Sequence, residues 1–262
     1  MPPARLVVLL HAVVVGLGLL LGVAPAWAEP AIWLVTDRDS RMYLLGSFHY
    51  LSPNVSWRTD RIDALLAEAQ EVWFEVEEIE GIPSPKRISF LRRYGFDQSR
   101  KLTSWLTPDE MKTLATALQP FDLPRPAVEA LRPWLAASMA AGVTMAKLGM
   151  DPAQGVDRVL YARAHEHGKP MRALEAAEDS FRVLATLPDE VHLAGLRQVL
   201  HREDQLGAVF IRLQAAWQRG DEAALERELA AASALEHPAV HEAVFIGRNR
   251  AWVETLVAAA SR

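Results

Sequence analysis

A histidine at the end of an apolar run is the first residue of this chain that could do chemistry. The stretch MYLLGSFHYLSP, residues 42–53, passes from apolar side chains through Gly46 to His49. Because ligands of open α/β sheets bind at the carboxyl ends of strands, a histidine there can face a ligand. Gly46 has no side chain, which lets a backbone or a ligand come close. A GxxH spacing is a weak motif by itself, and the alternative is a structural histidine with a satisfied hydrogen bond.

A carboxylate follows in the segment EVWFEVE, residues 71–77, which is rich in β-branched and aromatic residues and predicts a strand. Three of the four residues before Glu75 are strongly apolar, so we expect a partly buried carboxylate that needs a partner, a metal or a raised pKa. If residues 42–48 and 71–77 form neighbouring parallel strands, His49 and Glu75 share one edge. Together they could hold a divalent cation or activate a water molecule. The alternative is that Glu75 pairs structurally with an arginine.

An arginine suited to that role lies near the end of the chain. Arg248 lies on the apolar stripe of a predicted helix, four residues after Val244 and four before Trp252. A charge on such a stripe is costly unless it is paired. Arg248 could serve Glu75, Asp157 or an anionic group of a substrate, and its neighbour Asn249 can donate or accept a hydrogen bond.

Two further carboxylates lie at the ends of predicted elements. Asp157, in the motif QGVD, is near the start of a helix, where the helix dipole favours a negative charge. Simple stabilisation of the helix start is the alternative for this residue. Glu175 ends the segment PMRALE, residues 170–175, and would lie on the same edge as His49 if the sheet is parallel.

The elements that must position these residues are a few strands and many helices. We predict strands at residues 31–37, 42–48, 71–77 and 170–175, and a helix at 56–70 whose length favours a parallel crossover. Thr107 and Glu110 predict a capping box at the start of a further helix. We therefore expect one α/β (α+β) domain over residues 29–262, with a small mixed sheet near the N-terminus and a large helical insertion at roughly residues 84–170.

The composition excludes several classes of site. The sequence has no cysteine, so disulfides, thiolate metal sites and a cysteine nucleophile are excluded. The formal net charge is −5 with scattered acidic residues, and no stripe of basic residues indicates a nucleic-acid partner. The motifs HExxH and GxSxG are missing, as are those of the nucleotide-binding folds. The run HEH at residues 165–167 is typical of a solvated helix end, because residues two apart on a helix point in different directions.

The first 28 residues have the pattern of a secretory signal peptide. Arg5 precedes an apolar stretch, Pro25 breaks it, and the small residues of AWA precede an expected cleavage after Ala28. The rival interpretation is a retained membrane anchor, since residues 6–24 are just long enough to span a bilayer. We expect a mature chain that is periplasmic or secreted and has no stable membrane span.

Taken together, six segments resemble the TraB/GumN family: YLLGSFHYLSP, VWFEVE, RPWLAA, GVDRVLYARAHEHGKPMRALEAAEDSFRVLATLP, AWQRGD and RNRAW. The resemblance implies the fold of the erythromycin-esterase/ChaN-like and Tiki group. Tiki proteins are metal-dependent proteases, and the esterase relatives use a histidine with glutamates to activate water. The resemblance also implies a first GxxH motif and a set of acidic and polar positions, matched here by Gly46, His49, Glu75, Asp157, Glu175, Arg248 and Asn249.

One departure from the family pattern divides the functional hypotheses. Such proteins usually continue after the RN helix to a strand with a second GxxH, whereas this sequence ends at Arg262, so we expect either a truncated form or a degenerate member. The first hypothesis is an exported, metal-dependent hydrolase acting on a peptide or small molecule. In it, His49 and Glu75 hold Mn, Co or Zn, or act as base, and Arg248 holds an anion or orients Glu75. The second, favoured by the missing motif, is a non-catalytic periplasmic protein linked to envelope polysaccharide or peptide signals. A third is a purely structural role for these residues.

Overall fold

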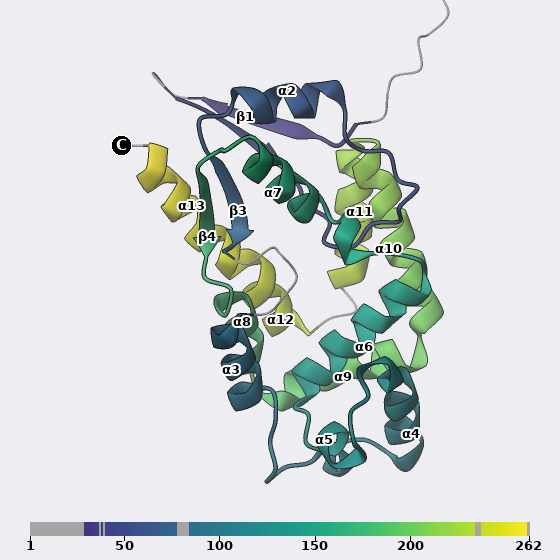
Figure 1. The fold of residues 1–262 in the computed structure, drawn as a ribbon. Coiled ribbons are helices and arrows are strands. Elements are labelled where there is room, and N and C mark those ends of the chain that lie inside the picture. Colours follow the sequence, from purple (N-terminus) through teal and green to yellow (C-terminus); the bar gives the residue numbers. More distant parts are fainter. Residues whose placement is uncertain (1–28, 37, 39, 78–83, 234–236, 261–262) are drawn as a thin grey trace, which may run out of the picture.

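The computed structural model describes residues 29–36, 38, 40–77, 84–233 and 237–260 of the chain. The predicted signal peptide at residues 1–28 lies outside the described residues. The fold combines two small sheets with a large helical portion (Figure 1). This confirms the predicted α/β class with small sheets near the N-terminus and a helical bulk.

The first sheet is an antiparallel hairpin of two strands, β1 (Ile32–Thr36) and β2 (Arg41–Leu45). Its inner end is anchored by Ile32 and Leu45, which pair with each other and pack against a cluster that contains the buried Trp217. The indole N–H of Trp217 donates to the carbonyl that follows β2, at Gly46 (2.8 Å). The hairpin is therefore attached to the C-terminal half of the chain through one buried tryptophan.

The second sheet is a parallel pair, β3 (Val72–Val76) and β4 (Met171–Glu175). The two strands begin side by side, because the N–H of Val72 donates to the carbonyl of Pro170 (2.9 Å). They also end side by side, with Val76 opposite Glu175. The strand predicted at residues 170–175 is thus confirmed, and its carboxyl end lies beside that of β3.

The predicted pairing of the second and third strands is wrong. β2 and β3 belong to different sheets, although α2 (Asp60–Glu68) connects them as expected. The reason is that β3 has its own core, in which Phe74 packs with the apolar faces of α2 and of a later helix. Its hydrogen-bonding partner is β4, so the parallel crossover runs through the long segment between those two strands.

Helices and short 3₁₀ turns fill the segment between β3 and β4. The capping box is confirmed, with Glu110 N–H donating to the Thr107 hydroxyl and Thr107 N–H donating to the Glu110 carboxylate. Pro133 begins a new helix, since a proline is tolerated in the first turn, where its missing N–H is not needed. The α-helices of this segment are α3 (Pro85–Tyr94), α4 (Pro108–Ala117), α5 (Arg125–Glu129), α6 (Pro133–Lys147) and α7 (Val156–Glu166).

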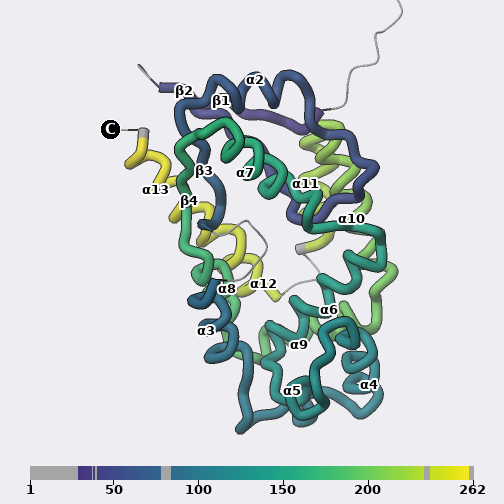
Figure 2. Tube along the Cα trace, in the orientation of Figure 1, coloured from purple at the N-terminus to yellow at the C-terminus, as the bar shows by residue number. Residues whose placement is uncertain are grey.

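The chain after β4 is helical. The elements are α8 (Asp179–Thr186), α9 (Asp189–His201), α10 (Glu203–Gln218), α11 (Glu222–Ser233), α12 (Pro238–His241), a π-helix (Glu242–Gly247) and α13 (Arg248–Ala260). The largest buried cluster joins α4, α6 and α9 through Leu114, Trp134 and Leu196. Figures 1 and 2 show the last helix, in yellow, passing along β4, so the end of the chain returns to the small parallel sheet.

In the part of the chain that the structure describes, no helix combines the length and the apolar character needed to cross a membrane.

Candidate functional site

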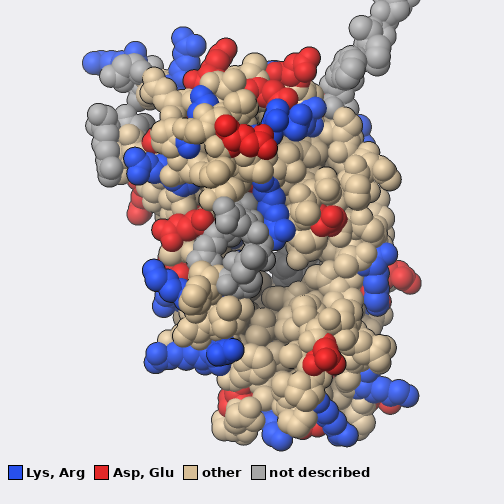
Figure 3. Space-filling view, in the orientation of Figure 1, with Lys and Arg blue, Asp and Glu red and all other residues tan. Residues whose placement is uncertain are grey.

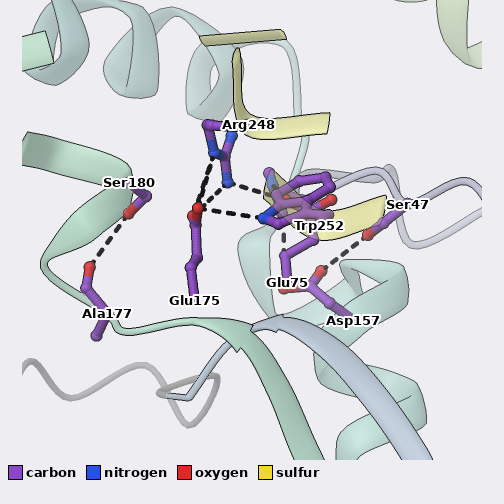
Figure 4. A network of polar contacts seen from close by, with 9 residues as sticks. Ser47, Glu75, Asp157, Glu175, Ala177, Ser180, Arg248 and Trp252 are labelled. Atoms are coloured by element: carbon purple, nitrogen blue, oxygen red, sulfur yellow. Dashed lines mark hydrogen bonds and ion pairs between the residues drawn. The ribbon is translucent and has the colours of Figure 1, made fainter. Parts of the chain in front are cut away.

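Polar side chains from distant parts of the chain meet at the carboxyl ends of β3 and β4. Glu75 is the penultimate residue of β3 and Glu175 the last of β4. Asp157 comes from the first turn of α7, and Arg248 from the first position of α13. Figure 4 shows these side chains directed toward one another from their separate elements. His49 joins them from the loop after β2, although β2 is in the other sheet.

The closest partner of the histidine is Asp157. His49 Nδ1 lies 3.3 Å from Asp157 Oδ2, and the Ser47 hydroxyl donates to Asp157 Oδ1 over 3.4 Å. The loop is held to α7 by the backbone as well, because the N–H of Val156 donates to the carbonyl of Phe48 (2.9 Å). One side of the imidazole is thereby fixed to the start of a helix.

The other side of the imidazole faces Glu75. His49 Nε2 lies 3.8 Å from Glu75 Oε2, which is within ion-pair range but longer than a hydrogen bond. The His49 side chain is 57% exposed, Glu75 is 29% exposed and Asp157 is 19% exposed. The histidine side chain is therefore open to solvent or to a small ligand, whereas the carboxylate beside its Nδ1 is mostly buried.

Arg248 ties the two strand-end glutamates together. Its Nη2 donates to Glu175 Oε1 (2.6 Å) and to Glu75 Oε2 (3.3 Å), and its Nε donates to Glu175 over 3.2 Å. The indole N–H of Trp252 also donates to Glu175 (3.2 Å), while its ring lies under the guanidinium at 4.6 Å. Arg248 is only 16% exposed, so the predicted need for a partner on the apolar stripe is met by carboxylates.

A π-helix leads directly into Arg248. Residues Glu242–Gly247 form this wider turn, and α13 begins at the next residue. Since a π-helix changes the rotation of the residues that follow it, the turn sets the direction in which the guanidinium leaves the helix.

The contact between His49 and Asp157 shifts the pKa of both residues. The hydrogen bond to Asp157 raises the pKa of His49 above its usual value, helped by the charges of Asp157 and Glu75 and opposed by burial and by Arg248. Burial works against ionisation of Asp157, but the hydrogen bond and charge of His49 outweigh it and hold the pKa of this carboxyl below its usual range. The pair therefore favours an imidazolium beside a carboxylate.

Two of these residues have donor atoms that fit a divalent metal ion. Metal–ligand distances of about 2.1 Å in a tetrahedral site place two donors about 3.4 Å apart, close to the 3.8 Å between His49 Nε2 and Glu75 Oε2. Asp157 contacts the opposite ring nitrogen, the position of a carboxylate that orients a ligand histidine. Within the described residues there is no group of three or more histidine, aspartate or glutamate side chains arranged to hold a metal ion.

The structure separates the predicted site residues into two groups. His49, Glu75, Asp157, Glu175 and Arg248 are brought together. Asn249 is exposed, and no hydrogen bond or ion pair between described residues joins it to them. Gly46 is also outside: its carbonyl accepts the bond from Trp217, and a side-chain carbon there would meet that indole only at ordinary contact distance, 3.7 Å.

Three participants were missed by sequence reasoning. Ser47 lies within the GxxH motif, and Trp252 is one helical turn after Arg248. The spacing of both residues from the predicted site residues could therefore have indicated that they take part. Trp217 lies in the segment AWQRGD, but nothing in its spacing indicates a contact with Gly46.

The fold and the site define an α/β protein with a histidine–carboxylate cluster at the ends of two parallel strands. The family model TraB/PrgY/gumN family matches residues 31–262, and the chain belongs to that family. No curated protein and no solved structure matches the chain.

Proposed function

We propose that this family member is a hydrolase in which His49 takes a proton from water. The observation that carries the proposal is the order of groups Asp157, His49 and Glu75, in which one ring nitrogen contacts Asp157 and the histidine side chain is 57% exposed. A general base needs a fixed orientation, access to water and a pKa near the working pH. The contact of Nδ1 with Asp157 supplies the fixed orientation, the exposed side chain supplies access to water, and the third requirement is addressed by the raised pKa of His49.

The roles follow from the contacts. With Asp157 at Nδ1, that nitrogen carries the proton and Nε2 presents its lone pair to solvent. After Nε2 takes a proton from water, the imidazolium is stabilised by Asp157 on one side and Glu75 on the other. Arg248 holds Glu75 in place, and its position beside the ring suits it to bind an anionic group of the substrate.

A divalent ion at the same atoms is the alternative way for this site to activate water, because an ion bound to His49 Nε2 would occupy the lone pair that otherwise takes the proton. His49 Nε2 and Glu75 Oε2 are the two atoms that would hold Mn, Co or Zn, with Asp157 orienting the ring. When bound, such an ion lowers the pKa of water and polarises a carbonyl oxygen. The substrate class that we propose is a peptide or ester carbonyl. The signal-peptide pattern of residues 1–28 supports an exported protein, so the proposed reaction takes place outside the cytoplasm.

The test is turnover of a peptide and ester panel by the mature chain, with and without added Mn, Co or Zn. His49→Ala, Asp157→Asn and Glu75→Gln are each expected to lower kcat by roughly 10²- to 10⁴-fold while circular dichroism stays unchanged. His165→Ala is the matched control, since that histidine is exposed at the end of α7. No turnover under any condition, or the same rate in His49→Ala, would overturn the proposal.

A second candidate is a non-catalytic binding protein. One observation favours it: His49 lies between two carboxylates, which stabilises a protonated imidazole, and a protonated imidazole cannot act as a base. The His49 cation and Arg248 would then bind an anionic ligand without changing it. In that case His49→Ala removes ligand binding, and no variant or metal alters any rate of hydrolysis.

A further inference from the structure

A second polar surface lies on the helices next to the parallel sheet. α3 carries Lys86, Arg87, Arg92 and Arg93 and has no acidic residue, although the chain as a whole has a net charge of −5. Figure 3 shows lysine and arginine side chains gathered over the region where Figure 1 places α3. A local excess of positive charge on an acidic protein is a feature that an anionic ligand can recognise.

Two of these cations, Lys86 and Arg93, line a groove between α3 and the start of α8. The groove has a volume of about 500 Å³. Its α3 wall is formed by Lys86, Ser89, Phe90 and Arg93, which lie at i, i+3, i+4 and i+7 and so share one face of the helix. Two cations and a hydroxyl therefore point toward one space, with an aromatic ring between them.

The arginines of the groove rest on a pair of aromatic rings. The ring centroids of Phe90 and Tyr94 are 4.6 Å apart. The guanidinium carbon of Arg182, from α8, lies 5.5 Å from the Phe90 centroid, and that of Arg93 lies 5.3 Å from the Tyr94 centroid. Cation–π contacts at these distances hold guanidinium groups in place. Two like charges are thus positioned beside one groove before any ligand binds.

The carboxylates near the groove do not balance these charges. Glu178 is the acidic residue among those that line it, against Lys86, Arg93 and Arg182. Arg182 Nε donates to Asp179 over 3.1 Å in a half-exposed pair, which leaves its other nitrogens available. None of the ion pairs between described residues includes Lys86 or Arg93. The groove keeps a net positive charge.

We propose that this groove binds a small phosphate-bearing dianion, such as a diphosphate or a phosphate monoester. Arginine guanidinium groups match the oxygens of phosphate in pairs, and a lysine adds a point charge. Ser89 supplies a hydroxyl donor, and the groove is large enough for one small ligand. The site is independent of His49 and of any hydrolase activity.

The experiment uses inorganic pyrophosphate as the probe and the whole mature chain as the protein. Calorimetry at low salt should give saturable binding, with NMR shifts confined to α3 and α8. Arg93→Gln and Arg182→Gln should each weaken binding roughly tenfold or more, because each removes charge-assisted hydrogen bonds. Arg92→Gln is the matched control: it removes the same charge from the same helix at an exposed position outside the groove, and should change affinity less than about threefold.

Three results would overturn the proposal. The first is an absence of saturable pyrophosphate binding by the unaltered chain. The second is equal weakening by Arg92→Gln and Arg93→Gln, which would show attraction to diffuse surface charge. The third is binding to vesicles of phosphatidylcholine with about a third phosphatidylglycerol but no binding of pyrophosphate, which would assign α3 to a membrane surface. Arg93→Glu, which reverses an exposed charge, should abolish pyrophosphate binding with an unchanged circular dichroism spectrum.

Discussion

Gly155 lies so close to the backbone of His49 that adding a single methyl group there should disturb the histidine site. A side-chain carbon built at this residue would lie 2.6 Å from the carbonyl oxygen of His49 and 3.0 Å from its carbonyl carbon. These are backbone atoms, so they cannot turn aside as a flexible side chain can. Overpacking of this kind costs about 1–3 kcal/mol in the free energy of unfolding. For domains of about 150–250 residues, Gly155→Ala should then lower the melting temperature by roughly 2–12 °C.

The same substitution should change the titration of His49. The new carbon would also lie 3.1 Å from Asp157 Oδ1, so the loop must move away from α7 and the contact between His49 and Asp157 must lengthen. The pKa of His49 should therefore fall back toward its usual value, which an NMR titration of the imidazole Cε1–H resonance measures. Thermal unfolding followed by circular dichroism measures the loss of stability.

Gly195→Ala provides the matched control for this experiment. Gly195 lies inside α9, and nothing is within 4 Å of the carbon that the substitution adds. Alanine should stabilise that helix by about 0.5–1 kcal/mol. If Gly155→Ala melts at or above the temperature of the unaltered chain and leaves the pKa of His49 in place, the close approach of the loop to α7 does not position the histidine.

Three other predictions concern the charged groups. Glu175→Gln should lower the free energy of unfolding by about 1–3 kcal/mol in urea titrations, because it leaves the mostly buried Arg248 with weaker partners. Asp157→Asn should lower the pKa of His49, which an NMR titration measures. In the unaltered chain, the contribution of His49 to stability is fully present below pH 6.5 and is lost as the pH rises through the raised pKa. Glu110→Gln should lower the free energy of unfolding by about 2 kcal/mol near neutral pH and by much less near pH 2. The hydrogen bond from Thr107, with those from His201 and Arg197, lowers the pKa of Glu110 to about 2. The stabilisation by this carboxylate is therefore lost as the pH falls from 4.5 toward that value. An unfolding free energy that Glu110→Gln changes equally at both pH values would contradict the last prediction.

Local signals in the sequence predicted several of the elements that position the candidate site. The capping box at Thr107, the strand that ends at Glu175 and the stripe that places Arg248 one turn before Trp252 all depend on residues close together in the chain. Such features are set by backbone hydrogen bonds and helix periodicity, which short segments contain. A charge on an apolar stripe also indicates that the residue has a partner in the fold, because an unpaired buried charge is too costly.

The pairing of strands could not be predicted in the same way, because it depends on which apolar faces meet. β2 and β3 are joined by one helix, but Leu45 packs with the Trp217 cluster and Phe74 packs with α2 and α7. Each strand buries its apolar residues in a different cluster, and the sequence of a strand alone does not show which cluster it will pack against. The partner of Arg248 was open for the same reason: Glu75 and Asp157 were the predicted carboxylates, and the structure pairs Arg248 with Glu75 and with Glu175.

The site forms even though the sheet expected to build it does not. His49 is positioned by α7, through the bond from Val156 to Phe48 and the contact with Asp157, and not by strand pairing with β3. The two glutamates are positioned by the parallel sheet and joined by Arg248. Among the described residues of the cluster, the only ion pair or hydrogen bond between side chains of these two units is the 3.8 Å approach of His49 to Glu75. Because that gap is wider than a hydrogen bond and open to solvent, it is the place where a water molecule, a metal ion or a substrate group has room to bind.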